Sequence, residues 1–434
     1  MSLSPKNKIG LALSGGGYRA TAFHLGTLRT LHRLGILDKV DVISTISGGS
    51  ITGACYMASE KDFPEFYEEL YMDLQRKNVI KWVLLSPIGL RFLLLLGILG
   101  GSFYFLFAGP AWLFPVIWLL VFILLYFFQF ALLPISRRIE KVYNRFFYKG
   151  MTLDQLPAHP RLVIGATNLQ TARPFVFSRT YMQDSTYQFL DEPIKFNPKG
   201  FPLARAVMAS SCVPFAFTPV RIHRKFFQDP AQAKTIHPIL VDGGVYDNQG
   251  IHKVMQKGSF ACDIVITSDA GAGSSGELRF RNTFSLLLET VEVFMSRIKK
   301  VQMVRNVYDN AATAGKEIAY LSLGWDLDKC IPGFISNLAK GQITDKVKEA
   351  HGLLPEWIAD PNAHEAAITQ HLQDRTGYST IKEPGPDAKA LARKVGTNLT
   401  ALSKARVDAL VGQAAALTEL QVKLYCPSLF TTKP

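Results

Sequence analysis

The sequence lacks the cysteine spacings that mark disulfide frameworks and zinc sites. Its five cysteines, Cys55, Cys212, Cys262, Cys330 and Cys426, are scattered, odd in number and never arranged as CxxC. Disulfide and zinc frameworks both need closer or paired spacing. We therefore predict small core cysteines in a reducing compartment, and a chain that uses no metal and no other cofactor.

Other absences narrow the function further. The sequence has no GxxxxGK[ST] loop, and no GxGxxG turn with an acid at a later strand end, which argues against a nucleotide site. No nucleic-acid motif accompanies the net charge of +13, so an anionic lipid surface is the expected partner and nucleic acid is not. Residues 1–17 hold no apolar run of signal-peptide length, and we expect the chain to start on the cytosolic side.

Charge is missing altogether between residues 92 and 135. The stretch divides at Gly109–Pro110, a natural turn, into apolar segments 92–108 and 111–135. A membrane-spanning helix needs roughly 17 to 25 apolar residues, and a snorkelling Arg91 lengthens the first segment. We predict a hairpin of two transmembrane helices.

Basic residues flank this hairpin on both sides. The positive-inside rule therefore places both of its ends, and the rest of the chain, on the cytoplasmic side of an integral membrane protein. Two alternatives stay open, which are a re-entrant or in-plane hairpin and a hairpin buried inside a soluble protein. The flanking residues are Arg76, Lys77, Lys81, Arg137, Arg138, Lys141, Arg145 and Lys149.

Strand and helix patterns alternate outside the hairpin. Helical spacing follows each of the first two expected strands after a glycine turn, and this order favours an α/β fold with a mostly parallel sheet. The last ninety or so residues are mostly helical, with a Pro/Gly-rich break at 382–389. The expected strands are residues 9–13, 40–45, 161–169, 174–179, 238–244 and 261–270.

Ser47 lies in a turn that suits a nucleophile. Residues 45–49, TISGG, leave an expected strand and begin a helix. A sharp strand-to-helix turn exposes a serine hydroxyl at a helix N-terminus, where backbone N–H groups favour negative charge. The usual pattern is GxSxG, so Thr45 makes the match incomplete. A plain glycine turn capped by Ser47 is the alternative.

A second glycine turn offers an oxyanion site. Gly15, Gly16 and Gly17 separate a strand from a helix without side chains, so successive N–H groups there can point at one anion. His24 and the other histidines lack a convincing partner. Asp242, at a strand end before two glycines, instead offers a carboxylate at the same sheet edge as Ser47.

Four motifs in one order resemble the patatin-like phospholipases, and the first two also resemble the related catalytic domain of cytosolic phospholipase A2. They are SGGGYRA…FHLGTL, the serine turn, RAVMASSCVPFAFTPV and VDGGVYDNQG, and the likeness covers roughly residues 8–75 and 150–250. The resemblance implies a three-layer α/β fold and a Ser–Asp dyad without histidine. It implies that Ser47 is the nucleophile, that Asp242 is the base and that Gly15, Gly16 and Gly17 form the oxyanion loop, with Arg19 binding substrate.

The expected function is that of a membrane-anchored lipid acyl hydrolase of the phospholipase A type, acting on membrane phospholipid. An esterase or acyltransferase on lysolipids or neutral glycerides is one alternative, and a non-catalytic membrane scaffold is another. We divide the chain into two halves of a patatin-like catalytic domain, an inserted hairpin with its basic flanks and a helical C-terminal region. The two halves of the catalytic domain are residues 1–75 and 150–345. The hairpin with its flanks is residues 76–149, and the C-terminal region is residues 346–434.

Overall fold

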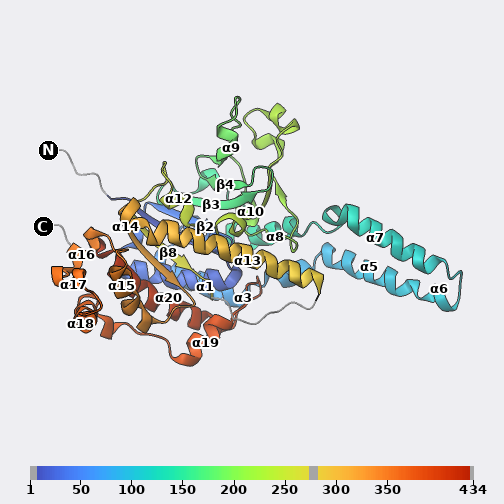
Figure 1. Ribbon diagram of the computed structural model, residues 1–434. Coiled ribbons are helices and arrows are strands. Elements are labelled where there is room, and N and C mark those ends of the chain that lie inside the picture. Colours follow the sequence, from blue (N-terminus) through green and yellow to red (C-terminus); the bar gives the residue numbers. More distant parts are fainter. Residues whose placement is uncertain (1–6, 273–281, 431–434) are drawn as a thin grey trace.

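A mixed sheet lies at the centre of the computed structural model, which describes residues 7–272 and 282–430 (Figure 1). Within those residues nine strands join in the order β5-β4-β3-β2-β1-β8-β9, with β7 beside β3 and β6 beside β7. The strands are β1 (Ile9–Leu13), β2 (Val42–Ile46), β3 (Arg161–Asn168), β4 (Arg173–Ser178), β5 (Met182–Asp184), β6 (Val220–Arg221), β7 (Ile239–Asp242), β8 (Ile264–Asp269) and β9 (Glu317–Ser322).

The centre of the sheet is parallel and one side is antiparallel. Strands β3, β2, β1, β8 and β9 pair in parallel, whereas β4, β5, β6 and β7 pair antiparallel. The predicted mostly parallel α/β sheet is therefore confirmed. The short strands β5 and β6, and the parallel edge strand β9, were absent from the prediction.

Helices cover both faces of the sheet and make three layers. Along β1, Leu11 and Leu13 face the larger core, which includes residues of α1, α2, α3, α10 and α20, while Ala12 faces a smaller core with α12. This alternation is what a strand buried on both faces requires. The helices are α1 (Gly17–Arg33), α2 (Gly48–Ala58), α3 (Phe63–Arg76), α9 (Ser185–Gln188), α10 (Leu203–Ser210), α11 (Gly244–Asp247), α12 (Ile251–Met255), α13 (Thr283–Met303) and α14 (Asn310–Thr313).

The C-terminal region is helical, as expected, and shares the larger core with the sheet. Helix α20 packs along α1, where a Cβ at Gly26 would lie only 2.4 Å from the carbonyl oxygen of Val411. Leu410 and Leu417 of α20 join Leu28 of α1 in that core. The helices here are α15 (Cys330–Ala339), α16 (Asp345–His351), α17 (Pro355–Ala359), α18 (Glu365–Thr376), α19 (Pro386–Lys394) and α20 (Lys404–Tyr425).

The apolar insertion projects from this body as a pair of helices (Figure 1). Segments Pro87–Phe107 and Leu113–Tyr148 are long and apolar enough to cross a membrane, and their most apolar windows are 6% and 0% buried. A hairpin buried inside a soluble protein is therefore wrong. The elements are α4 (Val79–Leu84), α5 (Pro87–Ser102), α6 (Tyr104–Phe107), α7 (Leu113–Leu132) and α8 (Ile135–Tyr143).

The foot of the hairpin is tied to the body. Arg91 on α5 donates to the Leu132 carbonyl at the end of α7 over 3.0 Å. Ile139 and Tyr143 of α8 are fully buried in the larger core. The guanidinium of Arg145 lies 4.4 Å from the ring centre of Trp82. The projecting pair is thus continuous with packed structure, and α8 belongs to the body rather than to the hairpin.

Candidate active site

Ser47 occupies a strained elbow between β2 and α2. Its φ and ψ are 48° and −113°, a region that a non-glycine residue rarely adopts. Its N–H donates to Oγ of Ser210 over 2.9 Å, and Ser210 in turn donates to the Gly165 carbonyl over 2.6 Å. A serine held this way presents its hydroxyl at the first turn of a helix, which is the geometry of a nucleophile elbow.

The structure explains how Thr45 fits where the usual pattern has glycine. Its hydroxyl donates to the Val163 carbonyl over 3.2 Å and accepts from Ser50 over 3.0 Å. Its methyl group fills the space left by Gly53, because a Cβ there would lie 2.6 Å from Cγ2 of Thr45. The close approach of strand and helix is therefore obtained at Gly53 instead of at position 45.

Strand register brings Asp242 to Ser47. On one side of β3, β2 runs parallel and ends with Ile46 opposite Gly165. Strand β7 runs antiparallel beside the rest of β3 and ends with Asp242 opposite Ala166. The two strands therefore meet end to end. We expected Asp242 at the same edge of a parallel sheet as Ser47, but β7 is antiparallel and reaches Ser47 from the opposite direction.

The Asp242 carboxylate is buried but supported. It is 5% exposed, and Oδ1 accepts the Gly244 N–H over 2.7 Å. Burial raises the pKa of Asp242 to about 6, while hydrogen bonds from the Gly244 backbone and the Ser47 side chain act to lower it. A carboxylate with that pKa is ionised at neutral pH and more basic than an exposed one, which suits a general base.

The triple-glycine loop faces the same point. Gly16 (φ 138°) and Gly17 (φ 56°) adopt conformations that favour glycine. Gly15 donates its N–H to the Asn248 carbonyl over 2.9 Å. Within residues 7–272 and 282–430 the N–H groups of Gly16, Gly17 and Gly48 have no acceptor. These three amides are the ones available to an oxyanion.

Close packing of the two helix starts depends on the missing side chains. A Cβ at Gly48 would lie 2.3 Å from the Gly17 carbonyl oxygen. A Cβ at Gly17 would lie 2.4 Å from the carbonyl oxygen of Asn398, which also accepts the Tyr18 N–H over 2.9 Å. The loop before α20, which contains Asn398, therefore packs directly against the triple-glycine turn.

Arg19 lies beside the triple-glycine loop. Nη1 donates to the Val395 carbonyl over 3.3 Å, and in the described part of the chain its buried Nε has no acceptor. A Cβ at Gly16 would lie 3.5 Å from Nη2. Burial lowers the pKa of Arg19, and the charges of Asp269 and Glu292 act to raise it. The guanidinium thus retains a donor beside the loop.

His24 is a structural histidine beneath the loop. Nε2 donates to the Ser14 carbonyl and Nδ1 accepts from the Ser268 hydroxyl, both over 2.9 Å. This pairing puts the proton on Nε2, because a carbonyl only accepts. Burial lowers the pKa of His24 to about 4, so the ring is neutral at pH 7. Both nitrogens are occupied, and neither is free to serve Ser47.

Comparison with known families decides the assignment. The model of the patatin-like phospholipases matches residues 11–255, more than half of the chain. The chain belongs to the patatin-like phospholipase family. It is therefore a serine hydrolase of lipid acyl esters. The matched range encloses α5 to α7, so the hairpin interrupts the patatin-like domain.

Solved structures and curated proteins add less. VipD from Legionella pneumophila has 12% identity and a TM-score of 0.33 over 90% of this chain and 83% of its own. Human GIVD cytosolic phospholipase A2, in complex with methyl gamma-linolenyl fluorophosphonate, has 13% identity and a TM-score of 0.47 over 99% of this chain and 59% of its own. The chain thus spans about three-fifths of that human protein. No curated protein matches it.

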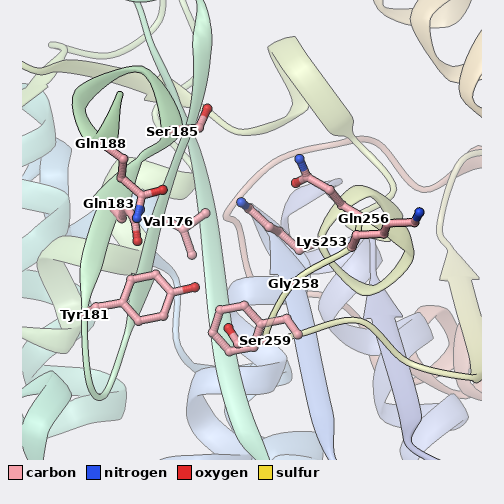
Figure 2. A pocket seen from close by; sticks show the side chains of 11 residues that line it. Val176, Tyr181, Gln183, Ser185, Gln188, Lys253, Gln256, Gly258 and Ser259 are labelled. Carbon is pink, nitrogen blue, oxygen red and sulfur yellow. The ribbon is translucent and has the colours of Figure 1, made fainter. Parts of the chain in front are cut away.

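Two cavities of the patatin-like chain are lined by none of the predicted site residues. One, of about 280 Å³, opens beside β4, where Gln183 and Gln188 lie across Val176 from Lys253 and Gln256 (Figure 2). The other, of about 650 Å³, lies between α2, α3 and residues 146–151. Groups of three or more His, Cys, Asp or Glu side chains that could hold a metal ion are absent from the described residues.

Several groups that shape the site were missed by the sequence analysis. Ser210 and Asn248 lie inside the third and fourth motifs, so their motifs were noticed but their contacts were not. Gly48 follows Ser47 and was the one detectable from a general rule, because the residue after an elbow serine commonly supplies an oxyanion donor. Asn398 has no local signal, since its role arises only when α20 packs on α1.

Proposed function

We propose that this patatin-like hydrolase is a membrane-anchored phospholipase of the A type that uses a dyad of Ser47 and Asp242. The single observation that carries the proposal is the head-on meeting of β2 and β7 beside β3. It supports a hydrogen bond between the Ser47 hydroxyl, which lies on the strained elbow, and the buried, ionised carboxylate of Asp242. No third residue is needed to activate the serine.

The reaction follows from these positions. Oγ of Ser47 attacks the ester carbonyl carbon while its proton passes to Asp242. The tetrahedral intermediate collapses, the proton moves to the departing alcohol, and an acyl group stays on Ser47. Water then attacks this acyl-enzyme, gives its proton to Asp242 and releases the fatty acid. The proton returns to Ser47, and the dyad is restored.

The oxyanion loop, Gly15 to Gly17, stabilises the negative charge on the former carbonyl oxygen. Gly16 and Gly17 supply N–H donors, and Gly48 supplies a further one from the start of α2. Gly15 holds the loop against Asn248. Preorganised donors of this kind are typically the largest single contribution to acyl-transfer catalysis. Arg19, whose buried Nε has no acceptor among the described residues, is placed beside the loop to bind the phosphate of a phospholipid.

Contacts at the foot of the hairpin support the proposal that the substrate is taken from the bilayer. Asp242 N–H donates to the Cys212 carbonyl over 2.8 Å. Six residues after Cys212, the Thr218 hydroxyl donates to the carbonyl of Leu133, which lies just past the end of α7, over 3.1 Å. Between them lie Val213 and Phe215, which are 42% and 58% exposed. This short apolar segment joins the base to the proposed anchor and forms a rim over which an acyl chain can pass.

The proposed orientation of the protein in the membrane follows from the positive charge at both ends of the hairpin. Basic residues flank both ends of the hairpin, which supports two membrane crossings with the catalytic domain on the cytoplasmic side. Each basic residue near an anionic leaflet contributes about 1 kcal/mol of attraction. The anionic cytoplasmic leaflet is therefore the expected source of substrate.

Product analysis tests the proposed function. Purified chain is mixed with phospholipid vesicles, and released fatty acid and lysophospholipid are quantified for wild type and for Ser47→Ala. We expect equal amounts of the two products from wild type and neither from the variant. Transfer of the acyl group to another lipid with no free fatty acid would instead identify an acyltransferase. Hydrolysis of neutral glycerides alone would identify a lipase.

A further inference from the structure

The cavity of about 280 Å³ beside β4 is bounded by β5 and by α12. Strand register decides which side chains of β5 enter it. Gln183 pairs with Val176 of β4, so the two share a face of the sheet, and Val176 packs in the smaller core with α12. Asp184, the next residue, pairs with Phe175 and faces the larger core, where its carboxylate accepts from the Asn168 side chain over 3.0 Å. The acid of β5 is therefore turned away from the cavity.

The lining of this cavity is polar, and no Asp or Glu of the described residues belongs to it. Three glutamines contribute side-chain amides, Gln183 and Gln188 from one side and Gln256 from the other (Figure 2). Within residues 7–272 and 282–430 these amides make no hydrogen bond. Amides both donate and accept, as the hydroxyl groups of a polyol do. The rings of Tyr181 and Phe260, with centres 5.4 Å apart, add an apolar wall that suits the C–H face of a sugar ring.

Lys253 brings a positive charge to the cavity. Its side chain reaches from α12 towards Val176 of β4 (Figure 2). It is half-buried, and in the described part of the chain its ammonium makes no hydrogen bond and no ion pair. Burial lowers the pKa of Lys253, and the charge of Asp184 acts to raise it. An ammonium group partly removed from water and left without a partner is unfavourable, and an anion in the cavity would relieve this cost.

Further cations converge on α12 from other elements. Burial, and then the charges of Lys253, Arg305 and Arg173, lower the pKa of His252 to about 4. Arg173 begins β4, whereas Arg305 lies just after the end of α13. Lys257 also lines the cavity. Such a gathering of like charges raises the local positive potential and favours a ligand with more than one negative charge.

We propose that this cavity binds a small phosphorylated polyol, such as a sugar phosphate, with the phosphate on Lys253 and the hydroxyl groups on the glutamine amides. A phosphate monoester carries between about one and a half and two negative charges at neutral pH. The volume is just below the roughly 300 to 1,000 Å³ of common ligand pockets, so a ligand with a single ring is expected.

The ligand is expected to come from water and not from a lipid headgroup. Helix α12 lies towards the side of the body opposite to α5 and α7 (Figure 1). A bilayer crossed by those two helices would therefore lie away from the cavity. This choice of source rests on the proposed function, because it takes the hairpin as membrane-inserted, but the binding site itself does not.

Calorimetry on the full-length protein tests the binding site. The protein is held in nanodiscs of diether phosphatidylcholine, which has no acyl ester to cleave. Glucose 6-phosphate, fructose 6-phosphate and glycerol 3-phosphate are titrated separately, with glucose and inorganic phosphate as controls. We expect one site, and at least one of the three esters should bind about tenfold more tightly than either control. Binding of none of the three overturns the proposal, and equally tight binding of inorganic phosphate overturns the assignment to a polyol.

Variants locate the site in this cavity. Lys253→Gln should weaken binding of the tightest ester by about tenfold or more, because a charge-assisted hydrogen bond is lost. Lys340→Gln, at an exposed lysine of the C-terminal region, is the matched control and should bind like wild type. Unchanged affinity in a folded Lys253→Gln overturns the assignment to this cavity. If thermal unfolding shows that Lys253→Gln does not fold, Gln183→Leu decides in the same way.

Lysine labelling distinguishes the two sources of phosphate. Reductive methylation of Lys253 is followed by mass spectrometry with the tightest soluble ester or with vesicles of diether phosphatidic acid. We expect protection by the soluble ester and none by the vesicles. Protection by the vesicles alone would assign the cavity to a lipid headgroup and overturn the water-soluble ligand. Ser47→Ala should bind the ester like wild type, so a failure of this site and a failure of the proposed hydrolysis are separate results.

Discussion

Helices α1 and α7 obey opposite rules of burial. Helix α1 carries polar residues along its length, yet thirteen of its seventeen residues are buried, including Thr21, His24 and Thr27. Helix α7 has twenty residues and is almost wholly apolar, yet Val121 is its one buried residue. Apolar content alone therefore does not place a helix in a protein core. The side chains of Thr21, His24, Thr27 and Thr30 on α1 all have hydrogen-bond partners. The side chains of α7, by contrast, suit a surrounding that is itself apolar.

This contrast separates the part of the molecule expected to carry out catalysis from the part expected to bring lipid substrate to it. The body around α1 and α2 supplies the proposed Ser47–Asp242 dyad and the proposed oxyanion amides, and these need close packing and glycines. The hairpin supplies none of these groups. Changes in the body are therefore expected to affect every ester, while changes in the hairpin are expected to affect only esters held in a bilayer.

The largest effect is expected for Ser47→Ala. Losing the nucleophile should lower kcat by about 10³-fold or more on vesicles and on a soluble ester alike. The fold should persist, because only Oγ is removed, and thermal unfolding checks this. Ser50→Ala in the same turn is the control and should keep most of the activity. Substantial activity in Ser47→Ala together with an inactive Ser50→Ala would overturn the assignment of the nucleophile.

Asp242→Asn should come next, at about 10² to 10⁴-fold, because an amide cannot accept the proton of Ser47. His24→Gln should lower the melting temperature more than the rate, since His24 bonds Ser14 and Ser268. An Asp242→Asn variant with full activity, or a stably folded but inactive His24→Gln, would contradict the dyad.

The pH dependence follows from the same carboxylate. The pKa of Asp242 is raised to about 6, and only the ionised form acts as base, so activity should be present above pH 6 and lost as the pH falls through that value. Asp247 is a control of similar burial with a pKa of about 6, but it is bonded to backbone N–H groups of residues 249, 250 and 252. A stably folded Asp247→Asn should therefore keep the same acid limb. If the acid limb disappeared in Asp247→Asn, the limb would belong to Asp247, and its assignment to Asp242 would be wrong.

Removing the hairpin should act on one substrate only. Residues 92–131 are replaced by a short Gly/Ser linker, which keeps Arg91 and Leu132 at the foot. A cut wider than this, through α8, would remove Ile139 and Tyr143 from the core. We expect vesicle hydrolysis to fall by about tenfold or more, because membrane attachment is lost, and soluble-ester hydrolysis to remain. Equal loss on both substrates would mean that the hairpin supports the body.

The smallest effect is expected for Asn398→Ala. Its side chain accepts from the N–H and hydroxyl of Thr400, which shapes the loop whose carbonyl receives the Tyr18 N–H. Loosening this brace should lower kcat by about two- to tenfold through a less ordered oxyanion loop, with KM little changed. A change in melting temperature without a change in kcat would reduce the residue to a purely structural role.

The sequence predicted the parts of the site that are local. The glycine turns, Ser47 and Asp242 each stand at the end of a strand pattern, and the absence of charge marked the hairpin. The predicted direction of β7 was wrong, because the sequence of a short strand before Asp-Gly-Gly does not show whether the strand pairs parallel or antiparallel. Ser210 and Asn398 were missed because their contacts join segments distant in sequence.

Covalent labelling tests the central claim most directly. A fluorophosphonate reacts with a serine only when its hydroxyl is activated, and mass spectrometry of the digested protein locates the adduct. The account predicts one adduct on the peptide that contains Ser47, its absence in Ser47→Ala and much slower labelling in Asp242→Asn. An adduct on another serine, or equal labelling rates in wild type and Asp242→Asn, would contradict a Ser47–Asp242 dyad.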